Sequence, residues 1–341
     1  MEHNTEHPTI AFGDTRRQQA IPATPQALLA AVLAANHRTA DPRLKQVMDA
    51  LIRHLHAFAL EVQLAYEELE PGLDLLIRIG KTTGPEKNEG ILLANILGLA
   101  TLVGLIDAKK ALAAGGTEPA LIGPFWRANQ PTREYGADIA AAGTPGDKMI
   151  VTGRVLSLDG KPIVNARVET WQALPAGLYE NQDPHQEDMN LRARFETDEL
   201  GRFSFRSVRP AGYAVPVDGP CGDLLALQRR GIMRPAHLHF IVLAEGFRTL
   251  STQIFDADDP NAYSDVVFGA VGSLLRRFEQ DPDGIYRLDV ELRLEPGVMR
   301  IPMCHVPCAL CPVPCALCPV PCALIVNLGS NTTSVGRVLV L

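Results

Sequence analysis

The body of this 341-residue chain contains almost no cysteine. Of its seven cysteines, only Cys221 lies outside the short segment Cys304–Cys322. A disulfide framework requires cysteines spread through the fold, as in small secreted domains. The distribution therefore argues against a fold held together by disulfides.

The sequence also lacks long apolar runs and an excess of basic charge. No stretch reaches the roughly 18 apolar residues that predict a membrane span, and the formal net charge of -7 disfavours binding to nucleic acid. The first residues, Met1–Glu6, are polar and acidic, without the apolar core of a signal peptide. We therefore expect a cytoplasmic protein with no nucleic-acid partner.

The N-terminal third of the chain shows helical patterns. Thr24-Pro25 and Asp41-Pro42 each place an N-capping side chain before a proline at the first helical position. Apolar residues then recur every three or four positions, and we expect this amphipathic helix to end at Glu70-Pro71-Gly72. The sequence predicts a mobile arm over residues 1–22 and a helical dimerisation domain over residues 23–115.

From residue 116 the pattern changes to that of short strands separated by turns such as Asp159-Gly160. It predicts a mainly β catalytic domain, an antiparallel β-sandwich, over residues 116–300. Long insertions, at about 172–197 and 209–235, interrupt it, and loops of that length usually carry function. The expected strands are Met149–Leu156, Ile163–Trp171, Arg202–Val208, the strand bearing His237, Leu250–Phe255 and Tyr286–Leu292.

The final segment, residues 301–341, contains a perfect tandem repeat. Pro307–Val313 recurs as Pro314–Val320, and each copy contains a Cys-x-x-Cys spacing that superficially matches a zinc or iron–sulfur site. The repeat is proline-rich and has no charged residue or turn glycine. This composition favours a low-complexity extension that is not part of the fold.

Two histidines occur in one expected strand, as His237-Leu238-His239. Side chains two positions apart on a strand point the same way, so these imidazoles form half of a possible metal site. The same tripeptide occurs at His54-Leu55-His56 within the helical pattern. There, residues two apart diverge by about 200° and cannot hold one ion together, which predicts helix-surface residues.

Further ligands would have to come from elsewhere in the chain. Each long insertion carries a tyrosine close to glycine, Tyr179 in the first and Tyr213 in the second. Because the free pKa of tyrosine is about 10, a phenolate ligand needs a strongly Lewis-acidic ion such as ferric iron. A carboxylate or a third histidine is the commoner partner, and spacing alone leaves these candidates open: Asp183, His185, Glu187 and Asp218.

Several motifs between about residue 25 and residue 297 match one known family together. They are Gly123-Pro124-Phe125, Gly177-Leu178-Tyr179, Asn190-Leu191-Arg192, Thr197-Asp198, Gly201-Arg202, Arg209–Tyr213, Arg234–Phe240 and Thr252–Phe255. With them, the chain resembles the intradiol ring-cleaving dioxygenases, the catechol/hydroxyquinol 1,2-dioxygenase family. The runs Asp188–Arg192 and Tyr213–Pro220 are most similar to the hydroxyquinol branch, and Asp41–Lys45 with Arg53–His56 to the family's N-terminal dimerisation domain.

The resemblance implies a non-haem Fe(III), one per subunit, held by Tyr179, Tyr213, His237 and His239. Tyr213 would be the ligand that leaves and takes a substrate proton. The fixed charge of Arg234 is suited to stabilising a carbanionic substrate ring, and Gln253 would be a neutral hydrogen-bonding partner. A surface salt bridge for Arg234 and a ladder-face amide for Gln253 stay open as alternatives.

The resemblance also assigns a substrate pocket. Asn95 stands where relatives often have an acidic residue, and this exchange keeps hydrogen bonding but removes a charge. The residues that would line the pocket are Leu92, Asn95, Ile122, Gly123, Pro124, Phe125, Ala214, Val215 and Val217.

The implied activity is cleavage of hydroxyquinol (1,2,4-trihydroxybenzene) between its adjacent hydroxyls with O2, giving maleylacetate in aromatic catabolism. The implied assembly is a homodimer through the helical domain, and whether that domain holds a lipid stays open. One alternative is a catechol 1,2-dioxygenase giving cis,cis-muconate. A non-enzymatic β-sandwich binding module would explain the strands, but neither the glycine–tyrosine insertions nor the strand histidines.

Overall fold

The computed structural model describes residues 21–84 and 88–299, and its contacts divide into two units. The described part of the first unit is residues 21–74, and that of the second is residues 75–84 and 88–299. The predicted tail of residues 301–341, and all but the last two residues of the predicted arm, lie outside the described residues. The predicted domain boundaries stay predictions.

The first unit is helical. It contains α1 (Pro25–Asn36), α2 (Pro42–Glu61) and the first half of α3 (Tyr66–Thr82), and α1 packs against α2. Both predicted N-caps are confirmed: Thr24 Oγ1 accepts a hydrogen bond from the Ala27 amide, and the Asp41 carboxylate accepts two from the start of α2.

The predicted end of the amphipathic helix is wrong. The helix ends at Glu61, and Pro71 lies inside α3. Proline inside a helical pattern predicts a helix end, yet Pro71 stands in the second turn of α3, where its missing N–H removes one hydrogen bond near the helix start. A new helix that begins at Tyr66 therefore accommodates it.

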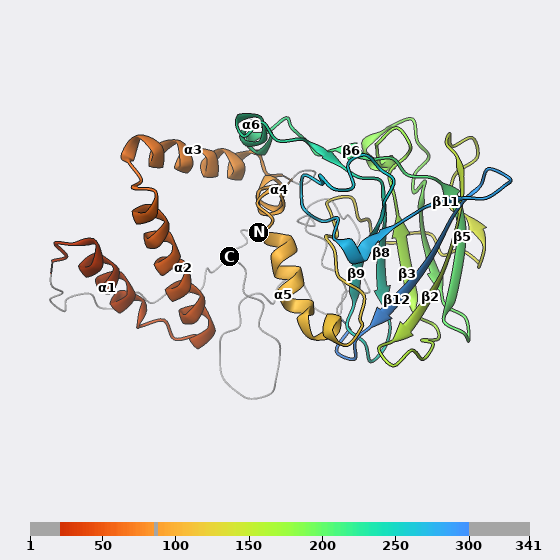
Figure 1. Cartoon of the computed structure of the whole chain (residues 1–341), viewed down its shortest axis with the longest axis horizontal. Coiled ribbons are helices and arrows are strands. Elements are labelled where there is room, and N and C mark those ends of the chain that lie inside the picture. Colours follow the sequence, from red (N-terminus) through yellow and green to blue (C-terminus); the bar gives the residue numbers. More distant parts are fainter. Residues whose placement is uncertain (1–20, 85–87, 300–341) are drawn as a thin grey trace, which may run out of the picture. The chain divides into compact units, whose positions relative to one another are not determined.

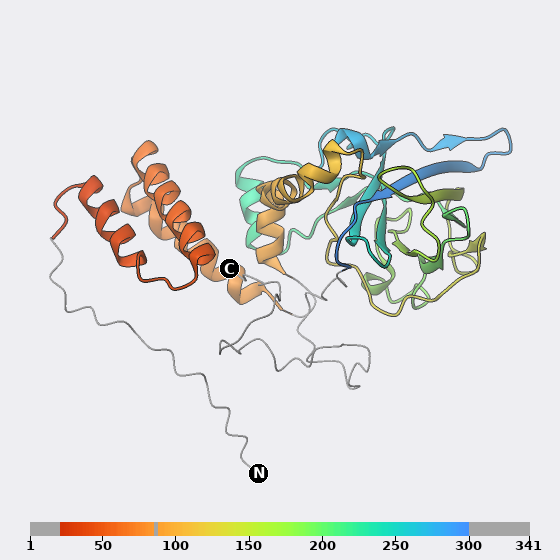
Figure 2. The same ribbon diagram turned by 90° about the horizontal axis from the view of Figure 1, so that it is seen from below.

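The second unit carries α4 (Glu89–Ile96), α5 (Leu99–Ala113) and α6 (Pro220–Leu227), and α4 lies beside α6 (Figures 1 and 2). Gly98 separates α4 from α5 with a φ of 72°, a left-handed conformation that glycine adopts without steric cost. Within the described chain, no single helix is long and apolar enough to cross a membrane. α4 and α5 together meet that test but are bent by 72° at their break.

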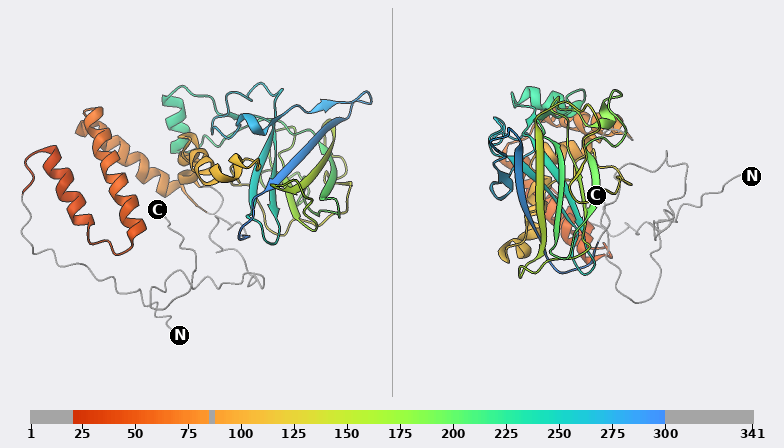
Figure 3. Two further views of the ribbon diagram at one scale, coloured as in Figure 1. Left: turned by 60° about the horizontal axis from the view of Figure 1, so that its bottom comes forward. Right: turned by 90° about the vertical axis from the view of Figure 1, so that its right-hand side faces the viewer.

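The predicted β-sandwich is confirmed, and its two sheets form two layers (Figure 3). One sheet has the order β1-β5-β2-β12-β11, and the other has the order β10-β9-β8-β3-β4. Their strands are β1 (Ala137–Asp138), β2 (Lys148–Ser157), β3 (Arg167–Trp171), β4 (Arg192–Glu196), β5 (Arg202–Val208), β8 (His237–Leu243), β9 (Leu250–Asp256), β10 (Leu275–Arg276), β11 (Glu279–Gln280) and β12 (Tyr286–Leu294).

The core lies between these sheets and follows from the alternation along the strands. Val151 and Val155 of β2 and Phe203 of β5 pack there against Phe240 of β8 and Ile254 of β9. Three strand pairs differ from the antiparallel prediction: β12 runs parallel to β2 along its whole length, and the short pairs β1–β5 and β10–β9 are also parallel, so both sheets are mixed. Strand periodicity reports which face of a strand is buried and carries no information on the direction of a distant neighbour.

Both insertions contain structure that periodicity did not reveal. The first holds a 3₁₀ turn, η1 (Glu180–Gln182), and the edge strand β4. The second holds the hairpin of β6 (Tyr213–Ala214) and β7 (Met233–Arg234), with α6 between them. A further 3₁₀ turn, η2 (Gly272–Leu274), precedes β10. These elements are too short to leave a periodic pattern, but they bring the insertion tyrosines to the sandwich.

Candidate metal centre

Three neighbouring strands set the base of the site. Trp171 of β3 and Gln253 of β9 are both paired in register with His239 of β8. Side chains of directly paired residues emerge on the same face of a sheet, so His239 is held from both sides. The Trp171 ring stacks on the imidazole with centroids 4.5 Å apart, and Gln253 Nε2 lies 3.1 Å from His239 Nδ1.

His237 is oriented by its own backbone. Its Nδ1 lies 2.7 Å from the Pro235 carbonyl oxygen, which can only accept a hydrogen bond. Nδ1 therefore carries the proton, and the lone pair of Nε2 faces His239 Nε2 at 3.1 Å. Burial and then the charge of Arg234 lower the pKa of His237 to about 3, so the imidazole is neutral at pH 7. A neutral, oriented imidazole is the form that binds metals.

The two insertion tyrosines meet these histidines. Tyr179, next to η1, places its Oη 2.9 Å from His239 Nε2, and its ring meets the Tyr213 ring edge-on with centroids 5.5 Å apart. Tyr213 of β6 places its ring 5.5 Å from that of His237. Both phenols are buried. Burial, followed by the proximity of Tyr213, raises the pKa of Tyr179 well above its usual value.

This donor set selects the kind of cation that fits. Two neutral imidazoles and two phenols with no carboxylate suit an ion acidic enough to ionise tyrosine, as ferric iron is. The described residues contain no group of three or more histidines, cysteines or carboxylates placed to hold a metal. The acidic and histidine alternatives at Asp183, His185, Glu187 and Asp218 therefore do not complete such a group.

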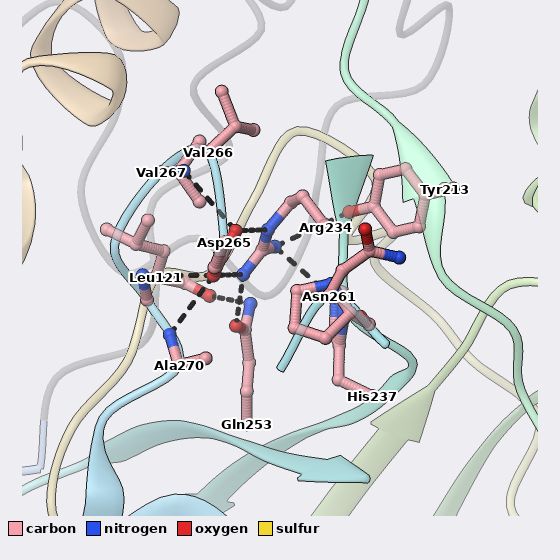
Figure 4. Close-up of polar contacts among 12 residues, drawn as sticks. Leu121, Tyr213, Arg234, His237, Gln253, Asn261, Asp265, Val266, Val267 and Ala270 are labelled. Atoms are coloured by element: carbon pink, nitrogen blue, oxygen red, sulfur yellow. Dashed lines mark hydrogen bonds and ion pairs between the residues drawn. The ribbon is translucent and has the colours of Figure 1, made fainter. Parts of the chain in front are cut away.

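Arg234 is the cation of the site (Figure 4). It ends β7 and is 4% exposed, so the surface salt bridge considered from sequence is wrong. Its Nη1 lies 3.4 Å from both Tyr213 Oη and His237 Nε2, while its Nη2 donates to Gln253 Oε1 at 2.8 Å. Gln253 in turn donates from Nε2 to the Leu121 carbonyl at 2.6 Å. This buried side chain therefore links Arg234 by hydrogen bonds to Leu121, the residue before the predicted pocket residue Ile122.

The predicted pocket residues fall into three groups. Phe125 stacks on Tyr179 with ring centroids 4.4 Å apart, Ile122 packs on the same aromatic cluster, and a Cβ on Gly123 would lie 3.5 Å from His239 Cε1. Leu92 and Val215 belong to a neighbouring apolar cluster. The remaining residues lie elsewhere in the same unit: Asn95, buried with no hydrogen-bond partner for its Oδ1, and the more exposed Pro124, Ala214 and Val217.

Three residues close to the centre were not singled out from sequence. Asp265 pairs with Arg234, Trp171 stacks on His239, and Arg192 binds the residue that follows Tyr179, with its Nε 2.6 Å from Glu180 Oε2. Asp265 follows Ser264 directly before an apolar run, and nothing in the local pattern marks it. Arg192 lies within the family motif Asn190-Leu191-Arg192, but the sequence does not predict its burial, because arginine is rarely fully buried.

Two models of known protein families match the chain, and together they include residues of both units. The family model described as "Catechol dioxygenase N terminus" matches residues 41–115, and the one described as "Dioxygenase" matches residues 121–296. The chain belongs to the intradiol ring-cleavage dioxygenases, a family of oxidoreductases that use non-haem iron.

Individual relatives are similar over most of their length. A hydroxyquinol 1,2-dioxygenase of Rhizobium sp. is 43% identical over 244 residues, which cover 71% of this chain and 82% of the relative. A catechol 1,2-dioxygenase of Candida albicans is 37% identical over 265 residues, 75% of this chain and 87% of the relative. The solved structure of a hydroxyquinol 1,2-dioxygenase from Pseudomonas putida superposes with a TM-score of 0.74 at 35% identity, covering 80% of this chain and 99% of that one.

Proposed function

We propose that Tyr179, Tyr213, His237 and His239 hold one Fe(III) per subunit for intradiol cleavage. The observation that supports this most is the orientation of His237: the hydrogen bond from Nδ1 to Pro235 turns the Nε2 lone pair into the site, 3.1 Å from the second imidazole and 3.4 Å from Arg234 Nη1. Bound there, Fe(III) would supply the Lewis acidity that binds two adjacent ring oxygens and makes the diol reactive toward dioxygen.

The surrounding side chains would handle protons and charge. Tyr213, bound as a phenolate ligand, would leave the metal and take a proton from the incoming diol, and its Oη lies 3.4 Å from Arg234 Nη1. Arg234 then stabilises negative charge that develops on the substrate ring, in a buried site where electrostatic interactions are strong. Gln253 holds the guanidinium through Oε1 without adding a charge.

The substrate we propose is hydroxyquinol, cleaved between its adjacent hydroxyls with O2 to give maleylacetate. The higher identity to a relative named for hydroxyquinol than to the Candida albicans relative named for catechol supports this choice. Within the pocket, Ile122, Gly123 and Phe125 would contact the ring near the iron, and Leu92 with Val215 would form an apolar wall. Asn95 would offer its unpaired Oδ1 to a ring hydroxyl. Pro124, Ala214 and Val217 would belong to the outer lip.

Oxygen uptake by the iron-loaded protein tests the substrate directly. We expect faster O2 consumption with hydroxyquinol than with catechol at equal concentration, with maleylacetate as the product. Much faster consumption with catechol, with formation of cis,cis-muconate, would replace our choice by the catechol alternative. No consumption with either diol would reject the proposed function.

We further propose that the protein works as a cytoplasmic homodimer through its helical region. On α2, the apolar side chains of Leu51, Leu55 and Phe58 are each at least 40% exposed in the single chain. They recur at spacings of four and three and thus form one stripe on the helix, the pattern of a packing face. The same stripe could accept a lipid instead.

A further inference from the structure

The guanidinium of Arg234 is divided between two environments. It has five N–H donors. Nε donates to Asp265 Oδ1 at 3.2 Å, and Nη2 donates to Asp265 Oδ2 at 3.2 Å and to Gln253 Oε1 at 2.8 Å. These bonds occupy one edge of the planar group. The remaining nitrogen, Nη1, faces Tyr213 Oη and His237 Nε2, each at a long 3.4 Å (Figure 4).

The carboxylate of Asp265 is held by backbone amides as well as by its ion pair with Arg234. Its Oδ2 also accepts hydrogen bonds from the Gly269 and Ala270 amides, both at 3.0 Å, and its Oδ1 accepts one from the Val267 amide at 3.3 Å. The side chain is 3% exposed. A carboxylate held by three backbone amides cannot rotate to follow the arginine, so it fixes the plane and direction of the guanidinium.

Gly269 lies against the ion pair of Asp265 and Arg234. A Cβ at this position would lie 3.0 Å from Arg234 Nη2 and 3.2 Å from Asp265 Oδ2. The loop after Asp265 thus presses directly against the ion pair. A side chain at position 269 would require the guanidinium or the carboxylate to shift by a few tenths of an ångström.

We propose that Asp265 is a positioning residue that aims Arg234 Nη1 at the substrate ring. The inference deepens and rests on the proposed function, in which Arg234 stabilises charge that develops during ring attack. An interaction made mainly in the transition state is lost from kcat, whereas loss of ground-state binding raises KM. In the described chain the side-chain hydrogen bonds of Asp265 go to Arg234 and to three backbone amides, and none goes to a proposed iron ligand or pocket residue, so its hydrogen bonds reach the site through Arg234.

The test compares Asp265→Asn with Asp256→Asn in the iron-loaded protein. Asp256 is a fully buried carboxylate that also holds an arginine, with its Oδ2 3.0 Å from Arg209 Nε, but outside the site. We expect Asp265→Asn to lower kcat by about tenfold to a hundredfold, the cost of a misplaced catalytic group. The KM for hydroxyquinol should change less than kcat, and the iron content and tyrosinate absorption should stay at wild-type values. Asp256→Asn should lower the melting temperature and leave kcat nearly unchanged.

The inference is overturned if the two variants lose kcat equally, or if Asp265→Asn mainly raises KM or loses iron. Should Asp265→Asn fail to fold, the kcat of Gly269→Ala is compared instead with that of its control, Gly272→Ala. The added methyl group displaces the guanidinium in the first variant but meets nothing within 4 Å in the second. A fall of kcat in Gly269→Ala but not in Gly272→Ala supports the inference, and an equal kcat in the two variants refutes it. Absence of turnover in the wild-type protein would instead refute the proposed function.

Discussion

His237 and His54 stand in the same tripeptide, yet only one is placed to bind a metal. His237 lies on a strand with Nδ1 held by a carbonyl, whereas His54 lies exposed on α2. We expect His237→Ala to lose iron and turnover. Loss of a residue that only supports a metal ligand typically lowers metal affinity by roughly tenfold or more, so loss of the ligand itself should cost at least that much. His54→Ala should keep both. Iron per chain, measured after desalting, checks this, and full iron in His237→Ala would show that the ligand assignment is wrong.

Tyr213 has two roles in the proposal, ligand and proton acceptor. Tyr213→Phe keeps the ring that packs against Phe125 and removes only the oxygen. We expect the variant to retain more iron than His237→Ala, because phenylalanine keeps the ring packing, whereas alanine removes the imidazole that packs beside Phe255. Its kcat should fall by about 10²–10⁴-fold, the usual contribution of a positioned proton-transfer group. Oxygen uptake at saturating hydroxyquinol measures this, and a near-normal rate would assign the proton transfer to another group.

Among elements, the first insertion depends on one buried arginine. Arg192 at the start of β4 is 1% exposed and donates to Glu180 and to the Phe125 carbonyl, joining the residue after Tyr179 to the pocket wall. Removing one partner of a buried ion pair typically costs about 3–5 kcal/mol when the other charge is left uncompensated. Glu180 keeps its second ion pair, with Arg127. Arg192→Met should therefore lower the free energy of unfolding by about 3 kcal/mol, the lower end of that range, in denaturant titration.

Arg202→Met is the matched control, because Arg202 pairs with Asp198 at the exposed start of β5. Its effect on unfolding should be far smaller. Similar midpoints for the two variants would show that the Arg192 network does not stabilise the insertion.

The elements predicted from sequence are those with local signals. Proline after a capping side chain predicted the starts of α1 and α2. The change to short strands between turns predicted β2, β5, β9 and β12, and an apolar, β-branched composition predicted β8. The parallel alignment of β12 with β2 and the short β6 and β7 depend on contacts between distant residues, which leave no local pattern. Likewise, the strand spacing of His237 and His239 predicted half of a site, but only resemblance selected the tyrosines. Asp265 was missed because its partner lies 31 residues away.

At the scale of the whole molecule, the exposed stripe on α2 predicts association. We expect the protein to sediment as a dimer of 37.0 kDa chains. Leu55→Glu, which places a charge at a side chain that is 55% exposed in the single chain, should shift it to monomers. Thermal melting should change little, because the residue is exposed in the single chain and lies outside the core. A wild-type monomer would reject the homodimer, and a variant that stays dimeric would place the interface elsewhere.

The central claim is that two tyrosines and two histidines hold ferric iron, and the visible absorption spectrum tests it most directly. Protein expressed with ample iron should be red-brown, from charge transfer between tyrosinate and Fe(III), and the band should diminish in Tyr179→Phe. A colourless, iron-free protein would contradict the account, as would a band unaffected by Tyr179→Phe.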